Sequence, residues 1–97
     1  MTLRFTPRAR ADLEKILGYL DRKNPQGAVN VARIMRKTLD VIGQFPHAGR
    51  LAGEEQTRVL PVGHYPYLIY WDIEAGEARI LHIRHAARRP WDAERKS

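Results

Sequence analysis

The hydrophobic residues of this chain change their spacing near its middle, and this change limits the folds that the chain can adopt. Between residues 7 and 45, apolar residues recur at intervals of three and four, which places them on one side of an α-helix. After residue 56, segments rich in Val, Ile, Leu and aromatic residues alternate with short turns that contain glycine, as is typical of β-strands. The order of these patterns predicts helices followed by strands in one layered domain.

Two pairs of residues that contain proline mark the helix boundaries. Thr6-Pro7 combines a capping hydroxyl with a proline suited to the first helical position, and Asn24-Pro25 ends one helix and opens the next. The first helix carries the apolar stripe Leu13, Ile16, Leu17 and Leu20. The second carries Ala28, Val31, Ala32, Met35, Leu39 and Ile42. We therefore expect a tight helical hairpin, closed at Gly43 and Phe45-Pro46.

Strands are predicted over residues 2–6, 57–62, 67–73 and 78–85, and residues 46–55 are predicted to form an exposed loop. The fold class is α+β, in the order strand, helix, helix, strand, strand, strand, with the helical hairpin packed on one face of a mainly antiparallel sheet. Residues 1–97 are expected to form a single domain with a basic C-terminal tail from about residue 86.

Alternation along the strands predicts which side chains face the helices. In residues 67–73, one face carries Tyr67, Ile69, Trp71 and Ile73, and the other carries Leu68, Tyr70 and Asp72. In residues 79–85, one face carries Leu81, Ile83 and His85, and the other carries Ile80, His82 and Arg84. If Leu81 and Ile83 join the core, His82 and Arg84 face outward, on a surface suited to nucleic acid or a partner peptide. An ordinary half-exposed amphipathic sheet has the same pattern.

Composition favours a macromolecular partner over a small molecule. The net charge of +6 favours polyanionic partners, and it is weighted towards the C-terminal end. The chain has no cysteine, its histidines do not have the spacing of metal ligands, and it has no glycine-rich phosphate loop. We therefore expect no metal and no cofactor. Without a secretion signal or an apolar run that could span a membrane, the protein is expected to be cytoplasmic, with no membrane partner.

The sequence leaves one enzymatic possibility open, which is metal-free cleavage of RNA. Such a reaction needs a base, an acid and cations that stabilise the charge developing on the phosphate. The candidates of the required types are Arg58, Arg79, His82 and Arg84, with His85 at a strand end. Histidine in a strand also commonly serves as a hydrogen-bonded structural residue, so both interpretations stay open.

Several strings of residues resemble the RelE/ParE superfamily of type II toxins, and the chain looks closer to the ParE branch. These strings are Phe5-Thr6-Pro7 leading into Ala11-Asp12-Leu13, Asn24-Pro25, Phe45-Pro46-His47-Ala48-Gly49-Arg50, Tyr67-Leu68-Ile69-Tyr70, and Ile80-Leu81-His82-Ile83-Arg84-His85-Ala86-Ala87-Arg88. The resemblance implies a toxin that a cognate antitoxin holds inactive in a hetero-oligomer. ParE-like members are associated with inhibition of DNA gyrase, and RelE-like members with cleavage of messenger RNA in the ribosome.

Local charge and the resemblance together suggest two binding surfaces. The expected target-binding residues are Arg84, Arg88, Arg89 and Trp91. An acidic amphipathic C-terminal segment of the antitoxin is expected to dock on Leu13, Leu17, Leu20, Leu68 and Tyr70. The alternatives are a ribosome-dependent endonuclease that uses Arg58, His82, Arg84 or His85, and an inactive homologue that only binds antitoxin.

Overall fold

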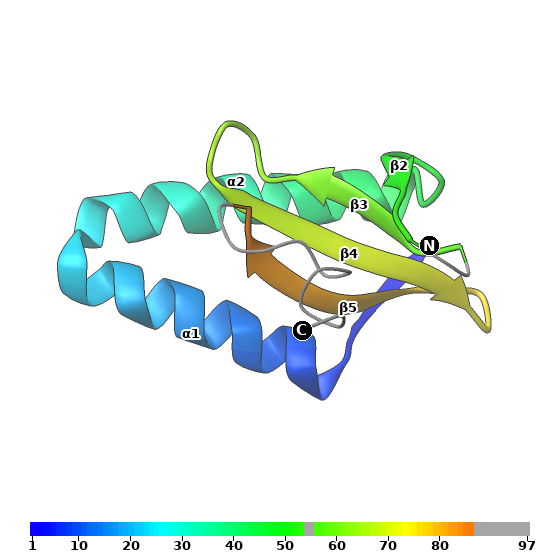
Figure 1. The fold of residues 1–97 in the computed structure, drawn as a ribbon, viewed down its shortest axis with the longest axis horizontal. Helices are drawn as coiled ribbons and strands as arrows, with labels where there is room; N and C mark the ends of the chain where they lie inside the picture. The colour runs from blue at the N-terminus through cyan, green and yellow to red at the C-terminus, as the bar shows by residue number, and fades with distance from the viewer. Residues whose placement is uncertain (54–55, 87–97) are drawn as a thin grey trace.

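The structure is a computed structural model, which describes residues 1–53 and 56–86. Its elements are β1 (Thr2–Phe5), α1 (Pro7–Lys23), α2 (Pro25–Gln44), β2 (Arg50–Leu51), β3 (Arg58–Pro61), β4 (Tyr67–Glu74) and β5 (Glu77–His85). The strands form one sheet in the order β1-β5-β4-β3-β2, in which β1 runs parallel to β5 and the other neighbours are antiparallel. The two helices lie side by side on one face of this sheet (Figure 1). The predicted α+β fold is therefore confirmed.

The helix boundaries follow from two capping residues. The hydroxyl of Thr6 accepts a hydrogen bond from the amide of Ala9 (3.1 Å), and Pro7 occupies the first turn of α1. Asn24 serves both helices. Its amide donates to the carbonyl of Leu20 (2.6 Å) at the end of α1, and its side chain accepts from the amide of Gly27 (3.0 Å) at the start of α2. The predicted hairpin is thus made with a single residue between its helices.

The core lies between the helices and the sheet. Its largest fully buried side chains include Met35 and Ile42 from α2 and Ile69, Trp71 and Ile80 from the central strands. Removing apolar surface of this size from water is the main source of stability in a domain of this length. The helical pair and the sheet therefore share one hydrophobic core.

The segment after α2 was predicted to be an exposed loop, and most of its described residues are exposed. It is nevertheless bound to the sheet and adds a fifth strand, β2, which was not predicted. The indole nitrogen of Trp71 donates to the carbonyl of Pro46 (2.9 Å), and the guanidinium of Arg58 donates to the carbonyl of His47 (2.8 Å). Gly49 has a φ of +75°, and a Cβ atom there would lie 2.5 Å from the carbonyl oxygen of Val59. With only two residues, β2 is too short to show a period in the sequence.

The alternation of side chains along β5 differs from the predicted one, because the strand contains a β-bulge. Tyr70 pairs with His82 while the next residue, Trp71, pairs with Ile80, so Leu81 has no partner on β4. Ile80 and Ile83 are consequently both buried, at 0% and 3% exposure, whereas Leu81 is only partly buried. The expectation that Leu81 rather than Ile80 joins the core was wrong, since the extra residue reverses the alternation within the strand.

Beyond the bulge, His82 and Arg84 face away from the helices, as the sequence predicted. His82 lies opposite Tyr70, and Arg84 lies opposite Leu68. Because directly opposed residues share a face of the sheet, these four side chains lie together on the face turned away from the helices.

Candidate functional surface on the outer face of the sheet

The face of the sheet turned away from the helices, the outer face, carries a mixed row of side chains across four strands. The register places Arg50 of β2 beside Val59 of β3, Val59 beside Tyr70 of β4, and Tyr70 beside His82 of β5. Arg50 was not among the predicted site residues, because β2 itself was not predicted. The row thus brings a guanidinium group onto the same face as a phenol and an imidazole.

His82 is held closely within this row. Its ring stacks on the ring of Tyr70 with 4.4 Å between centroids and 8° between planes. Although it lies on the outer face, His82 is only 8% exposed. Arg84, two residues further along β5, is partly buried and lies on the same face. The arrangement therefore offers a stacked aromatic pair with positive charge beside it, which suits contacts with a polyanion or a partner side chain.

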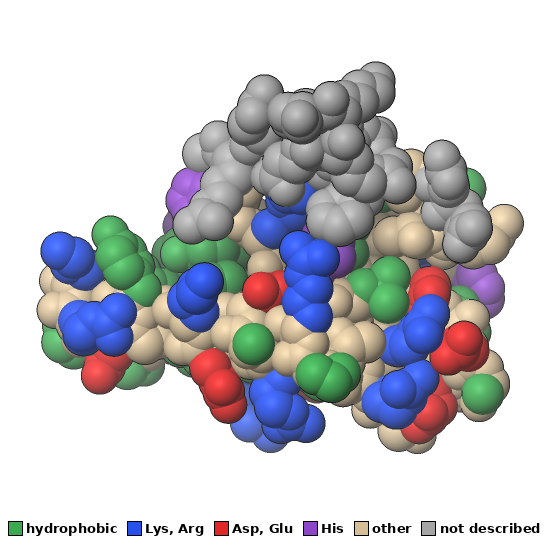
Figure 2. Space-filling view, turned by 60° about the horizontal axis from the view of Figure 1, so that its bottom comes forward, with side chains coloured by type: hydrophobic (Ala, Val, Ile, Leu, Met, Phe, Trp, Pro, Cys, Tyr) green, Lys and Arg blue, Asp and Glu red, His purple; other side chains and the backbone are tan. Residues whose placement is uncertain are grey.

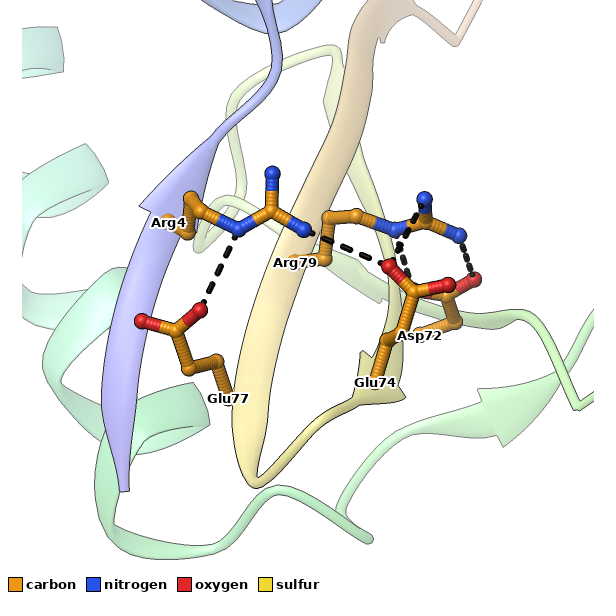
Figure 3. A network of polar contacts seen from close by, with 5 residues as sticks. All are labelled: Arg4, Asp72, Glu74, Glu77 and Arg79. Atoms are coloured by element: carbon orange, nitrogen blue, oxygen red, sulfur yellow. Dashed lines mark hydrogen bonds and ion pairs between the residues drawn. The ribbon is translucent and has the colours of Figure 1, made fainter.

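A network of ion pairs occupies the other end of the outer face (Figure 3). Arg79 binds both oxygens of Asp72 (3.0 and 2.7 Å) and also Glu74 (3.2 Å). Arg4 binds Glu77 (3.2 Å) and Glu74 (3.3 Å). The hydrogen bonds to Asp72 raise the pKa of the Arg79 guanidinium further above its ordinary value. The sequence identified Arg79 as a cation for a phosphate, but its charge is already compensated by carboxylates.

The other two candidates for RNA cleavage lie on the helix side of the sheet. Arg58 is opposite Trp71, and its guanidinium donates to the carbonyl of His47. His85 is opposite Tyr67, and their rings meet edge to face with centroids 5.4 Å apart. The structure therefore brings His82 and Arg84 together but separates them from Arg58 and His85 by the thickness of the sheet.

The residues expected to bind antitoxin also fall on two sides of the sheet. The three leucines of α1 are partly buried and pack against the core. Leu68 and Tyr70 lie on the outer face. These five residues do not form one continuous surface. Of the expected target-binding residues, Arg84 lies on the outer face, while Arg88, Arg89 and Trp91 lie outside the described residues.

A cluster near the closed end of the helical hairpin, where Asn24 joins α1 to α2, was not predicted. Tyr67 is 7% exposed, and burial, with a smaller contribution from Tyr19 of α1, raises the pKa of its hydroxyl. Tyr19 is itself 52% exposed, and the ammonium of Lys23 lies 6.0 Å from its ring centroid. This end of the molecule therefore presents an accessible aromatic ring next to a cation.

Positive charge on the helices is less compensated than on the outer face. Figure 2 shows Lys and Arg side chains spread along the α1 side of the molecule, with acidic side chains between them. In the described part of the chain, no carboxylate forms an ion pair with the exposed cations Arg10, Lys15, Arg22, Lys23, Arg33, Arg36 and Lys37. The helical layer therefore contributes much of the field that attracts polyanions.

The described residues offer neither a metal site nor a membrane-spanning helix. Residues 1–53 and 56–86 contain no group of three or more His, Asp or Glu side chains arranged to hold a metal ion. Neither of the two described helices is both long enough and apolar enough to cross a membrane.

Sequence comparisons identify similar proteins over most of the chain. A family described as "ParE toxin of type II toxin-antitoxin system, parDE" matches residues 3–90. "Toxin RelE2" of Caulobacter vibrioides is 34% identical over 84 residues, which are 87% of this chain and 93% of that protein. "Putative toxin Y4kP" of Sinorhizobium fredii is 30% identical over 84 residues, covering 87% of this chain and 86% of that one.

Two solved structures share the fold. The chromosomal ParDE toxin–antitoxin system from P. aeruginosa contains a chain that superposes with a TM-score of 0.78 at 24% identity, covering 88% of this chain and 95% of that one. The YoeB dimer from Staphylococcus aureus gives a TM-score of 0.60 at 10% identity, with the same coverage. At these identities the likeness shows a common fold.

Proposed function

This chain belongs to the ParE toxin family of type II toxin–antitoxin systems, and from this premise we propose that it inhibits DNA gyrase by binding. In this proposal the toxin has no enzymatic activity of its own, and a cognate antitoxin holds it inactive. The match to the ParE family over residues 3–90 supports the choice of target.

The separation of the candidate catalytic residues is the observation that favours binding over RNA cleavage. A general base, a general acid and a cation must all reach one phosphodiester. His82 and Arg84 lie on the outer face, whereas Arg58 and His85 lie on the helix side. His82 is also 8% exposed and stacked on Tyr70, which leaves it little freedom to approach a substrate.

The proposed contact with gyrase is made by Arg84 and by the basic residues that follow it in the sequence. Arg88, Arg89 and Trp91 combine positive charge with a large aromatic side chain, and Arg and Trp are the residues most often dominant in protein interfaces. Charge in this segment also favours fast association with an acidic partner surface.

The test is a supercoiling assay with purified gyrase and toxin. We expect the wild-type protein to inhibit supercoiling, and the double substitution R88E/R89E to weaken inhibition at least about tenfold. R33E/R36E, which reverses two exposed charges on α2, is the matched control and should inhibit as the wild type does. If R88E/R89E inhibits equally well, the contact surface is wrong; if the wild type does not inhibit, gyrase is not the target.

A second function, cleavage of messenger RNA on the ribosome, is favoured by one observation. Arg50, Tyr70, His82 and Arg84 share the outer face, and stacking rings with cations suit a single-stranded nucleic acid. One relative, Toxin RelE2 of Caulobacter vibrioides, also carries the name RelE. Induced expression separates the two functions, because gyrase inhibition causes DNA damage signalling, whereas RNA cleavage stops translation at once and yields new RNA 5′ ends. H82A would abolish such cleavage without affecting gyrase inhibition.

The antitoxin is proposed to neutralise the toxin through an acidic amphipathic C-terminal segment. The uncompensated cations of the helices and the exposed ring of Tyr19 support a partner that combines carboxylates with apolar side chains. Purification of the toxin with its genomic neighbour should yield a stable hetero-oligomer whose affinity falls as salt is raised. A toxin that is recovered alone, from cells that express both genes, would contradict this proposal.

A further inference from the structure

The N-terminal turns of α1 hold the bulge in β5 by three hydrogen bonds. The amide of Thr6 donates to the carbonyl of Ile80 (3.1 Å), and its hydroxyl donates to the carbonyl of Leu81 (3.0 Å). The carboxylate of Asp12 accepts from the amide of Ile83 (3.0 Å). In the sequence, Thr6 is recognisable only as a helix cap, and Asp12 only as part of a string that resembles the family. Neither role explains these contacts.

The contacts are made where the sheet has no strand to supply them. β1 pairs with β5 only as far as Phe5 and Ile80, so the peptide groups of β5 beyond Ile80 have no β1 residue beside them. An unsatisfied peptide group in a partly buried position is unfavourable by about 1–3 kcal/mol. Thr6 and Asp12 take the place of the missing strand. The carboxylate of Asp12 accepts from an amide of β5, and the hydroxyl of Thr6 donates to a carbonyl of β5.

The bulge decides which side chains reach the outer face. In a regular strand, Ile80, His82 and Arg84 would share one face. With Leu81 inserted, Ile80 and Ile83 both enter the core, while His82 and Arg84 point outward beside Tyr70 and Leu68. A change at the bulge would therefore exchange a core residue for a charged one or move the outer-face residues.

We propose that Asp12, together with Thr6, is a positioning residue for the outer face, because it fixes the bulge that presents His82 and Arg84. Asp12 also forms an ion pair with Arg8 at 3.9 Å. The positioning role belongs to its hydrogen bond with the amide of Ile83. The proposal rests on the proposed function only in taking the outer face as a working surface of the toxin.

The first measurement uses the wild-type protein. NMR scalar coupling across the hydrogen bond should link the amide nitrogen of Ile83 to the carboxyl carbon of Asp12. Absence of this coupling, in a protein with otherwise well-dispersed amide signals, would overturn the proposal even if every substitution at Asp12 prevented folding.

The second measurement compares three substitutions in α1. D12A should speed hydrogen exchange of the Ile83 amide at least about tenfold and shift the ring signals of His82, while amides in α2 keep their protection. D12N should restore both signals, because its amide oxygen accepts the same bond. E14A removes an exposed carboxylate of the same helix and should behave as the wild type does.

Growth arrest on induction gives the functional readout without assuming a target. We expect D12A to lose at least about tenfold in toxicity, D12N to retain it, and E14A to be unaffected. If D12A leaves Ile83, His82 and toxicity unchanged, Asp12 has no positioning role. If D12N restores the signals but not toxicity, the negative charge acts directly on a partner and the positioning role is wrong. Failure of gyrase inhibition alone would overturn the proposed target and leave these NMR results to decide the role of Asp12.

Discussion

Gly49 shows how closely the segment after α2 approaches the sheet. Its φ is +75°, and an added Cβ would lie 2.5 Å from the carbonyl oxygen of Val59 and 2.9 Å from the Trp71 ring. Backbone and a fully buried indole ring cannot easily move aside. Close packing at this residue therefore depends on the absence of a side chain.

We predict that G49A lowers the free energy of unfolding by about 2–4 kcal/mol, because backbone strain adds to a steric clash. Gly76 provides the control, since its φ is +74° but an added Cβ would meet nothing within 4 Å. G76A should lower the free energy of unfolding by about 1 kcal/mol, because only the backbone strain applies there. Urea denaturation of both variants measures the difference, and equal losses would show that the approach to Val59 is not tight.

The raised pKa of Tyr67 predicts a loss of stability at alkaline pH. Burial makes the folded protein hold the phenolic proton more tightly than the unfolded chain does. The free energy of unfolding is unaffected by this group below about pH 10, and it falls as the pH rises from there through the pKa of the folded state. In Y67F this contribution is absent, so its urea midpoint should fall less steeply above pH 10. Parallel curves for the two proteins would contradict the prediction.

At the scale of secondary structure, Asn24 has two roles, because this single residue ends α1 and caps α2. We predict that N24A destabilises the protein by about 1 kcal/mol through loss of the cap on Gly27. N24D should retain most of the stability, since its carboxylate accepts the same bond. Q26A, in the same exposed turn, is the control for surface substitution and should change the free energy of unfolding by less than about 0.5 kcal/mol.

Helix boundaries that depend on neighbouring residues could be predicted from the sequence. Features that depend on contacts between distant residues could not. Thr6, Asn24 and the prolines after them lie beside the helices that they limit, so the sequence displays these boundaries directly. The bulge at Leu81 depends on Thr6 and Asp12, which lie about seventy residues earlier and leave no local pattern in β5.

The candidate site was likewise predictable where it depends on alternation within one strand, and not where it depends on contacts between strands. Tyr70 and His82, and likewise Leu68 and Arg84, were correctly expected on one face, because regular alternation holds on that side of the bulge. Arg50 was missed, since its strand has two residues. The position of Arg58 on the helix side followed only from the register with Trp71, which no pattern within one strand contains.

At the scale of the whole molecule, the order of strands in the sheet differs from their order in the chain. β5 lies between β1 and β4, so the first and last described strands are neighbours. β4 and β5 are joined by the two-residue turn Ala75-Gly76, with φ of 53° and 74°. Pairing within this hairpin closes a short loop, whereas pairing of β1 with β5 encloses most of the chain and loses more chain entropy.

This difference predicts the order of folding. We expect I69V, in the β4–β5 hairpin, to slow folding, and L3A, in β1, mainly to speed unfolding. Both residues contact the same core, so the pair compares early and late contacts within one cluster. Stopped-flow measurements over a range of urea concentrations give both rates, and a slower folding rate in L3A with an unchanged unfolding rate would reverse the proposed order.

The place of β5 between β1 and β4 also has a consequence for synthesis on the ribosome. β1 and α1 leave the ribosome first, but both pack against β5, which is the last of the described elements to be translated. A messenger RNA that breaks before the codons for β5 therefore yields a fragment in which β1, α1 and β4 lack the strand that they pack against, and we expect such a fragment neither to fold nor to be toxic.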